Sequence, residues 1–478
     1  MGATRLKRPR NRCRVIRVWE YPWNSMTVWP VRGREMMSML RTMRRDPPAA
    51  MMTVGIILIM VSLLVLGCGG GENGVDGDQG QDGSAVELTW PVIYQDAQHA
   101  GRSASNGPSA ADVKWTYDAG SDTWSWAVLG MEGDVICGFM GKVVSVAAES
   151  GSLNWEFSTG GARATSCCVA GDGTVYASAG NTLYALSPQG AQKWSYDVGA
   201  EADEPAVDTD GTVYAGSVGG RLVALSKDGE LEWDATVGGD IRTPTIGEDT
   251  LYCGASPLVL YAFDKEGAKL WEARPEGDLP IYEGMMEWAN TLDYASIGND
   301  GTIYVGSFPY PGITSTGQMI PDYAIPTMGR LYAISPRGQV LWRYECPYGE
   351  CSYFNIHTPS IGVDGTLYAG TSHWRVLAID RDGNLIWEFN TGEDQTVCPS
   401  VFSPSIGKDG LLYAATTSGK MFCLNPDGTE KWRYDSGAPW LPGKSRSNNL
   451  TPPPIGDDGT LFTVQADGRV YAFKATGN

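Results

Sequence analysis

Few side chains in this sequence form a pattern known to perform catalysis. The only histidines are His99, His357 and His373, and the chain contains no HExxH, GxSxG or CxxC arrangement. The signatures of zinc proteases, serine hydrolases and thiol–disulfide oxidoreductases are therefore missing. We expect no catalytic residue and no metal site in this chain.

Cysteines offer a second kind of chemistry. Cys346 and Cys351 are separated only by Pro-Tyr-Gly-Glu, which predicts a local disulfide that closes a loop. Cys137, Cys253 and Cys423 stand where other copies of a repeated segment carry alanine. We therefore expect these three to be small, buried, apolar side chains.

The repeated segment is clearest from Thr358 to Asn390, which divides into four short apolar runs. Asp364-Gly365 and Asp382-Gly383 fill two of the gaps, and Asp-Gly is a strong signal for a tight turn between antiparallel strands. Apolar residues occur on both faces of the predicted sheet, so each copy needs a neighbour on each side. The pattern predicts a ring or stack of four-stranded sheets, each of about 40 residues.

A tryptophan marks the fourth strand of each copy. The eight are Trp115, Trp155, Trp194, Trp233, Trp271, Trp342, Trp387 and Trp432. Trp115 precedes every second strand, and the last copy, 460–473, has no tryptophan after it. We therefore predict an all-β protein over 113–478, an eight-bladed β-propeller of four-stranded antiparallel blades, with its last blade closed by the Trp115 strand. Each tryptophan is expected to lie on alanine and glycine of an adjacent sheet.

Every long departure from the repeat falls on one face of this ring. In an antiparallel blade, the links between blades and the links from second to third strands emerge together. The five long insertions all belong to these two kinds: 275–291, 308–328, 345–355, 393–401 and 436–450. Long loops usually serve binding, and aromatic residues in these would suit a protein or a polysaccharide: Tyr282, Trp288, Tyr310, Tyr323 and Trp440.

Three polar residues occupy equivalent places at the starts of first strands, on that same face. Alignment on the Asp-Gly turns brings Asp203, Arg242 and His357 into register. First strands lie next to the central channel, so a channel mouth of mixed charge is expected, with His357 titrating near pH ~6. The alternative is that these are ordinary solvated strand starts.

The repeat resembles a known family. The unit DGTxYxGs…LyAlnpdGxxxW is similar to the pyrroloquinoline-quinone (PQQ)-type propeller repeat, and Trp90-Pro91 with 95–102 resembles the lead-in found before such propellers. The resemblance covers 90–478. It implies a propeller of the kind found in quinoprotein dehydrogenases and in the non-enzymatic lipoprotein of the outer-membrane β-barrel assembly machinery. Because one fold hosts many functions, the resemblance indicates fold more than function.

One pair of residues favours the enzymatic branch of this resemblance. Cys167-Cys168 resembles the adjacent-cysteine disulfide beneath the quinone of PQQ alcohol dehydrogenases. Such a site also needs calcium held by Glu, Asn and Asp together with a catalytic Asp, and the strand starts offer only Asp203 and Glu204. We therefore expect a non-enzymatic protein without a cofactor, and keep a PQQ- and calcium-dependent oxidoreductase as the alternative.

The first part of the chain resembles a bacterial lipoprotein precursor. A basic leader, 1–50, precedes an apolar stretch, 51–67, and Cys68 follows Val65-Leu66-Gly67. The resemblance implies export and lipidation of Cys68, with 68–87 as a Gly/Asp-rich tether, 88–112 as the lead-in and the outer membrane as destination. Periplasmic and surface locations both remain open, and an uncleaved transmembrane anchor is the alternative.

Charge narrows the choice of partners. Residues 1–67 carry 12 of the 36 Lys/Arg and 3 of the 55 Asp/Glu, so the remainder carries 24 and 52, a net charge of −28. Such a surface repels nucleic acid and anionic lipid headgroups. We expect a monomeric ring that binds a protein partner and meets the membrane only through its lipid.

Overall fold

The computed structural model describes residues 16–17, 99–121, 123, 125–277, 291–308, 329–346, 355–392, 400–437, 452–465 and 467–475. All belong to one compact unit, which comprises 1–18 and 85–478. They form β-strands and no helix, and therefore no helix long and apolar enough to cross a bilayer. Cys68, Cys351 and the aromatic residues of the insertions lie outside the described residues.

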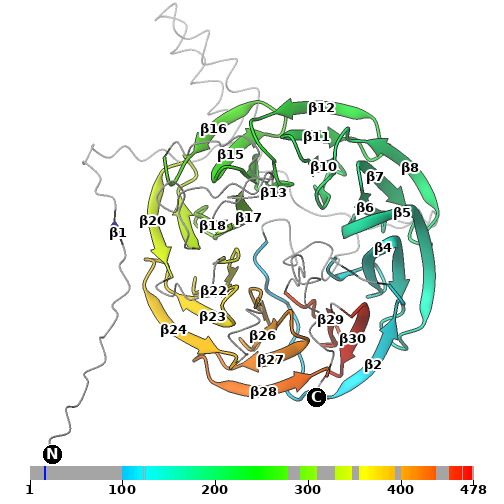
Figure 1. Cartoon of the computed structure of the whole chain (residues 1–478), viewed down its shortest axis with the longest axis vertical. Coiled ribbons are helices and arrows are strands. Elements are labelled where there is room, and N and C mark those ends of the chain that lie inside the picture. Colours follow the sequence, from blue (N-terminus) through cyan, green and yellow to red (C-terminus); the bar gives the residue numbers. More distant parts are fainter. Residues whose placement is uncertain are drawn as a thin grey trace, which may run out of the picture. The chain divides into compact units, whose positions relative to one another are not determined.

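The strands form seven antiparallel sheets arranged in a ring (Figure 1). Four of the sheets follow the chain in order. Their strands are β9 (Ala206–Val207), β10 (Val213–Gly216), β11 (Arg221–Leu225), β12 (Leu231–Thr236); β13 (Thr245–Ile246), β14 (Thr250–Ala255), β15 (Val259–Asp264), β16 (Lys269–Ala273); β21 (Ser360–Ile361), β22 (Leu367–Gly370), β23 (Arg375–Ile379), β24 (Leu385–Asn390); and β25 (Ser405–Ile406), β26 (Leu412–Ala415), β27 (Lys420–Leu424), β28 (Glu430–Asp435).

A fifth sheet gains a strand from far away in the sequence. Its own strands are β17 (Thr291–Ile297), β18 (Ile303–Phe308), β19 (Arg330–Ile334) and β20 (Val340–Glu345). The two-residue β1 (Ile16–Arg17) pairs with the outer edge of β20. The outermost strand of this sheet therefore has hydrogen-bonding groups that another strand can use.

The prediction of eight blades is not supported, because the first two predicted blades form one six-stranded sheet. Its strands are β3 (Val128–Leu129), β4 (Val135–Val146), β5 (Leu153–Val169), β6 (Val175–Ala179), β7 (Thr182–Leu186) and β8 (Gln192–Asp197). The long strand β5 pairs with β4 through its first half and with β6 through its second half. The chain thus carries eight tryptophan motifs on seven sheets.

The predicted ring closure is confirmed. The last sheet consists of β29 (Leu461–Val464), β30 (Arg469–Phe473) and β2 (Val113–Asp118). In it Trp115 lies opposite Ala472, and Val113 lies opposite Phe473. The ring is therefore joined by hydrogen bonds between the first and the last of its sequence repeats.

Each tryptophan links its own copy of the repeat to the next one. All eight indole N–H groups donate to a backbone carbonyl at 2.8–3.1 Å, and in seven copies the acceptor lies in the turn between the third and fourth strands of the following copy. In those seven the ring covers a glycine of the same turn, where an added Cβ would lie 2.5–2.8 Å from the indole. The tryptophans thus lie on a small residue of the adjacent copy, as expected, and the glycine that the ring covers belongs to a turn.

The lead-in segment supplies the eighth acceptor. β30 and β2 come from opposite ends of the ring sequence, so no turn joins them at the place where Trp432 needs a partner. The carbonyl of Pro108 accepts from Trp432 Nε1 at 3.1 Å and from the Tyr413 hydroxyl at 3.1 Å. The same segment crosses the ring (Figure 1), where Ala100 and Gly101 accept hydrogen bonds from first-strand residues at 2.9 Å.

The tryptophan contact can be measured by two glycine substitutions in one sheet. Gly219 (φ +81°) has nothing within 4 Å of an added Cβ, whereas at Gly229 (φ +85°) the Cβ would lie 2.8 Å from Trp194. Gly219→Ala should cost about 1–2 kcal/mol of unfolding free energy through backbone strain alone. Gly229→Ala should cost about 1–3 kcal/mol more, because the indole must move. Urea unfolding measures both, and equal losses would show that the indole contact carries no stability.

Candidate functional site

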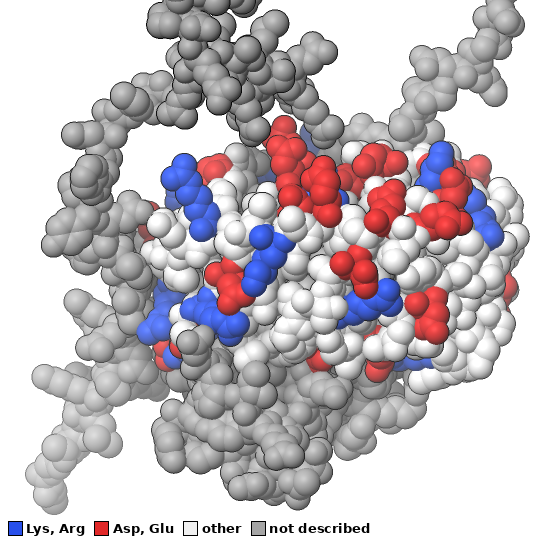
Figure 2. All heavy atoms as spheres, turned by 90° about the horizontal axis from the view of Figure 1, so that it is seen from above, with Lys and Arg blue, Asp and Glu red and all other residues white. Residues whose placement is uncertain are grey.

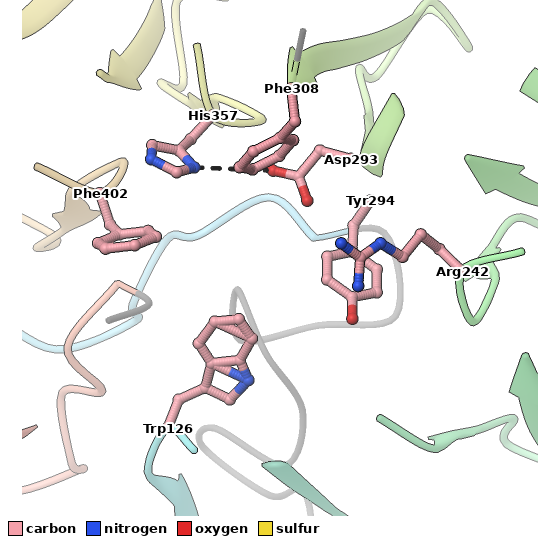
Figure 3. Close-up of a pocket in the computed structure, with 7 residues that line it drawn as sticks. All are labelled: Trp126, Arg242, Asp293, Tyr294, Phe308, His357 and Phe402. Carbon is pink, nitrogen blue, oxygen red and sulfur yellow. Dashed lines mark ion pairs between the residues drawn. The ribbon is translucent and has the colours of Figure 1, made fainter. Parts of the chain in front are cut away.

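Polar residues gather where the first strands begin, at the mouth of the central channel. Asp203, Arg242, Asp293 and His357 come from four consecutive sheets, each at or shortly before the innermost strand. Arg242, Asp293 and His357 line one pocket of about 50 Å³ together with four aromatic residues, Trp126, Tyr294, Phe308 and Phe402 (Figure 3). The predicted channel mouth of mixed charge is therefore present.

The structure pairs two of the three residues that the sequence placed in register. Arg242 Nη1 lies 3.2 Å from Asp203 Oδ1, and the guanidinium lies 5.7 Å from the centre of the Tyr294 ring. His357 lies instead beside Asp293, with 4.0 Å between Nδ1 and Oδ2 (Figure 3). All are largely buried except Arg242, whose side chain is 32% exposed. They are therefore not merely solvated strand starts.

Two adjacent carboxyl groups next to the pocket differ in protonation. Burial raises the pKa of Glu204 well above its ordinary value, and the charge of Asp203 raises it further. Burial opposes the ionisation of Asp203, but the Arg242 guanidinium and the hydrogen bonds from Glu204, the Thr243 N–H and Tyr294 together keep the pKa of Asp203 below its ordinary value. The Tyr294 hydroxyl contacts both carboxyl groups, at 3.0 Å from Asp203 Oδ2. Asp203 thus favours its charged form beside Arg242, whereas Glu204 favours its neutral form.

Asp293, not His357, titrates near neutral pH. Burial lowers the pKa of His357 to about 3, so its imidazole is neutral at physiological pH and the expectation of titration near pH 6 is wrong. Burial raises the pKa of Asp293 to about 6, although Arg242 and the N–H of Thr358 favour its charged form. The cause is that both side chains are more than nine-tenths buried, and burial disfavours whichever form carries charge.

Two buried nitrogen atoms at the pocket lack a hydrogen-bond partner. Within the described part of the chain, His357 Nε2 and Trp126 Nε1 are both orphaned, although each residue is more than nine-tenths buried. Buried polar atoms are rarely left unpaired, since an unmade hydrogen bond costs about 1–3 kcal/mol. These atoms therefore mark the pocket as a place where a bound group would gain hydrogen bonds.

The sequence predicted only Arg242 and His357 of the seven residues that line this pocket, although a signal for most of the others was present. Asp293 and Phe402 occupy the same repeat position as Asp203, Arg242 and His357, four residues before the Ile or Val of the first strand. Aligning on the Asp-Gly turns had selected only the other three. Trp126 lies one place later, and Tyr294 follows Asp293. Phe308 ends β18, and no repeat position indicates that it reaches the channel.

The five long insertions begin and end on the face that holds this pocket. Phe308 lines the pocket and is also the last described residue before one insertion, and Thr291, which begins β17, follows another. The opposite face is closed by tight turns, such as the one in which Gly211 N–H donates to Asp208 at 3.0 Å. Tyr282, Trp288, Tyr310, Tyr323 and Trp440 lie outside the described residues, so their placement stays a prediction.

The adjacent cysteines are separate thiols, which corrects the disulfide inferred from resemblance. Neighbouring residues of a strand point to opposite faces. Cys167 accordingly packs in one apolar cluster with Val128, and Cys168 packs in another with Tyr176. Burial raises the pKa of Cys167 to about 12 and that of Cys168 well above its ordinary value, so both stay protonated. The feature that favoured a quinone site is therefore not formed.

The remaining cysteines are buried as expected. Cys137, Cys253 and Cys423 each have 0% exposure and pack in the apolar interior between sheets. Cys346 is also buried, directly after β20, but its proposed partner Cys351 lies outside the described residues, so that disulfide remains a prediction. No three His, Cys, Asp or Glu side chains of the described ranges are grouped to hold a metal ion.

Charges of both signs occur on the side of the ring drawn in Figure 2, where acidic side chains gather along the upper edge. Among the described residues, several basic side chains pair with acidic ones, for example Lys142 with Glu156 at 2.9 Å. No broad basic stretch lies among the described residues of this side. This agrees with the exclusion of nucleic acid that the net charge suggested.

These features define a class. A ring of antiparallel sheets with a tryptophan link between successive copies is a β-propeller of PQQ-type repeats. Family models match 109–204, 179–350 and 298–478, and the chain belongs to this repeat family, described as "Outer membrane protein assembly factor BamB".

Solved structures support the fold. BamB from Moraxella catarrhalis aligns over 77% of this chain and 100% of its own, with 14% identity and a TM-score of 0.55. Sqt1 of Saccharomyces cerevisiae covers 77% and 100% at 12% identity (TM-score 0.58), and the computationally designed Ika8 protein covers 76% and 100% at 12% identity (TM-score 0.55). At these identities the likeness shows the fold alone. A comparison with curated proteins returns no match.

Thiol labelling checks the state of the adjacent cysteines. We expect iodoacetamide to leave Cys167 and Cys168 unmodified in the folded protein, because both are buried and protonated, and to alkylate both after denaturation without a reductant. Peptide mass spectrometry distinguishes the forms. A peptide lighter by two hydrogens that resists alkylation until reduced would show that the disulfide exists after all.

Proposed function

We propose that this chain is a non-enzymatic, lipid-anchored scaffold of the cell envelope that binds a protein partner through the face bearing the channel mouth. One observation carries the proposal: every long insertion begins and ends on the face that holds the pocket, while tight turns close the other face. A propeller needs no long loops to fold, so their confinement to one face indicates selection for binding. The family description, an outer-membrane assembly factor, agrees with an envelope role.

The anchor in this proposal is a lipid on Cys68. The order of basic leader, apolar stretch and Gly67-Cys68 supports export and processing. The Gly/Asp-rich tether would then hold the ring clear of the outer membrane, since about 20 residues of flexible chain span roughly 25 Å. A single ring satisfies the repeats, so no second copy is required.

Site-specific photo-cross-linking tests the proposed face. Glu201 and Asp210 are exposed acidic residues on either side of β9, the first on the channel-mouth face and the second on the opposite face. A photo-reactive residue at 201 should give a discrete protein adduct in intact cells, whereas one at 210 should give none. Each substitution removes one exposed charge and one polar contact, that of Glu201 with Arg163 or that of Asp210 with the Thr212 N–H, so urea unfolding of both variants must first show that they fold.

Two results would overturn the scaffold role. Adducts of equal yield from positions 201 and 210 would show that the wrong face was chosen. Retention of a polysaccharide by the purified protein, without protein adducts from either position, would favour the polysaccharide-binding alternative.

Lipidation is tested separately from partner binding. Cys68→Ala should release the protein from the membrane fraction while cross-linking from position 201 to a purified partner persists. Mass spectrometry of the mature protein should find an acylated cysteine as its first residue. An uncleaved 51–67 segment would instead support the transmembrane anchor.

A further inference from the structure

The pocket at the channel mouth is small and walled mainly by rings. Five of its seven lining residues are Trp126, Tyr294, Phe308, His357 and Phe402, and the rings of His357 and Phe402 lie 4.2 Å apart. Its volume of about 50 Å³ holds only a few non-hydrogen atoms. A ligand can therefore place only one small group there.

Among the described residues, Asp293 is the one charged side chain of the pocket lining that forms no ion pair with a lysine or arginine. The two charged residues of the lining are Arg242 and Asp293, and Arg242 pairs with Asp203. Glu204 is neutral and so is the His357 imidazole. At neutral pH the buried carboxylate of Asp293 is stabilised by the N–H groups of Thr358, at 3.3 Å, and Tyr294 and by the charge of Arg242, but no lysine or arginine of the described residues lies within ion-pair distance of it. A buried charge of this kind strongly favours binding of a cation.

The unpaired Nε2 of His357 indicates that the bound cation must carry a hydrogen-bond donor. His357 Nδ1 faces the Asp293 carboxylate, which favours the tautomer with hydrogen on Nδ1 and leaves Nε2 as an acceptor. An ammonium group has three N–H donors and is also attracted to the faces of aromatic rings. A metal ion is disfavoured, because no cluster of three ligating side chains occurs among the described residues.

We propose that the channel-mouth pocket binds a primary ammonium group on a short apolar stem, with Asp293 as its counter-ion and His357 Nε2 as a second acceptor. The stem would lie against the aromatic walls, and Trp126 Nε1–H would donate to water or to a carbonyl beside the stem. Such a group is the tip of a lysine side chain of a partner or a free alkylamine. The site extends beyond the scaffold role, because it requires only the pocket and no protein interface.

Titration calorimetry of the purified full chain with n-butylammonium chloride tests this site. We expect saturable binding at pH 7.5 and no binding of tetramethylammonium, which is cationic but has no N–H. Asp293→Asn should weaken binding at least tenfold. Asp300→Asn is the matched control, because Asp300 lies just beyond the other end of β17 on the opposite face, and it should change nothing.

The pH dependence gives a test that needs no variant. Asp293 faces Arg242, Asp203, Tyr294 and His357, and its carboxylate is charged above pH 6 and neutral below. The alkylammonium stays protonated throughout. The affinity of the wild type should therefore fall about tenfold from pH 7.5 to pH 5. Three results would each overturn the proposal: no binding of n-butylammonium, equal binding of tetramethylammonium, or an affinity that does not change between pH 7.5 and pH 5.

The source of the ammonium group is distinguished by a second probe. Nα-acetyl-lysine amide binding more tightly than n-butylammonium would identify a partner's lysine as the ligand, and equal or weaker binding would identify a free amine. Failure of both probes while position 201 still cross-links a protein would overturn the ammonium site and leave the scaffold role intact. Binding of the probes without any cross-linked protein from position 201 would support the ammonium site and overturn the scaffold role.

Discussion

The hydrogen bond from a tryptophan to the next copy of the repeat, made in seven of the eight copies, is the interaction on which the ring depends. Its N–H donates to a turn of the following copy, and its ring covers a glycine in that turn, for example Trp194 on Lys227 and Gly229. The indole therefore fixes the distance and angle between neighbours through a directional bond as well as through apolar area. Glycine is needed at this turn position for two reasons. It adopts the positive φ of the turn without strain, and it has no Cβ that would clash with the indole.

This arrangement frees the inner end of each sheet for other purposes. Because the outer strands carry the tryptophan links, the residue types at the start of each first strand can differ from copy to copy, although some of them also join neighbouring sheets, as Asp203 does with Arg242. Five sheets place Asp203, Arg242, Asp293, His357 and Phe402 there, at one position of the repeat. Copies of one repeat thus supply four different chemistries around a single channel, which is how a symmetric fold acquires an asymmetric site.

Much of the fold could be predicted from the sequence because it depends on local signals. Asp-Gly turns and periodic tryptophans predicted the all-β propeller and its closure by the Trp115 strand. The number of sheets was not predictable in this way, since β5 runs on from one copy to the next without a break that composition would reveal. The carbonyl groups that accept from the tryptophan indoles could not be predicted, because every residue has a backbone carbonyl whatever its type.

The candidate site was predicted less completely, for a physical reason. Position in the repeat brought Asp203, Arg242 and His357 together, but which of them pair depends on distances between sheets. Protonation depends on burial in the same way. Burial lowers the pKa of His357 to about 3 and raises that of Asp293 to about 6, and the sequence does not reveal how deeply either side chain is buried.

The closing strand has a consequence for the order in which this protein can mature. Val113 can pair with Phe473 only after all the intervening strands have been synthesised. Joining two points about 360 residues apart costs roughly 5 kcal/mol of conformational entropy in a flexible chain. Before that moment β2 and the lead-in have no docking partner, and both ends of the array present bare strand edges. During synthesis, the growing chain is thus an open arc in need of protection from self-association, and it becomes a closed ring only in its last step.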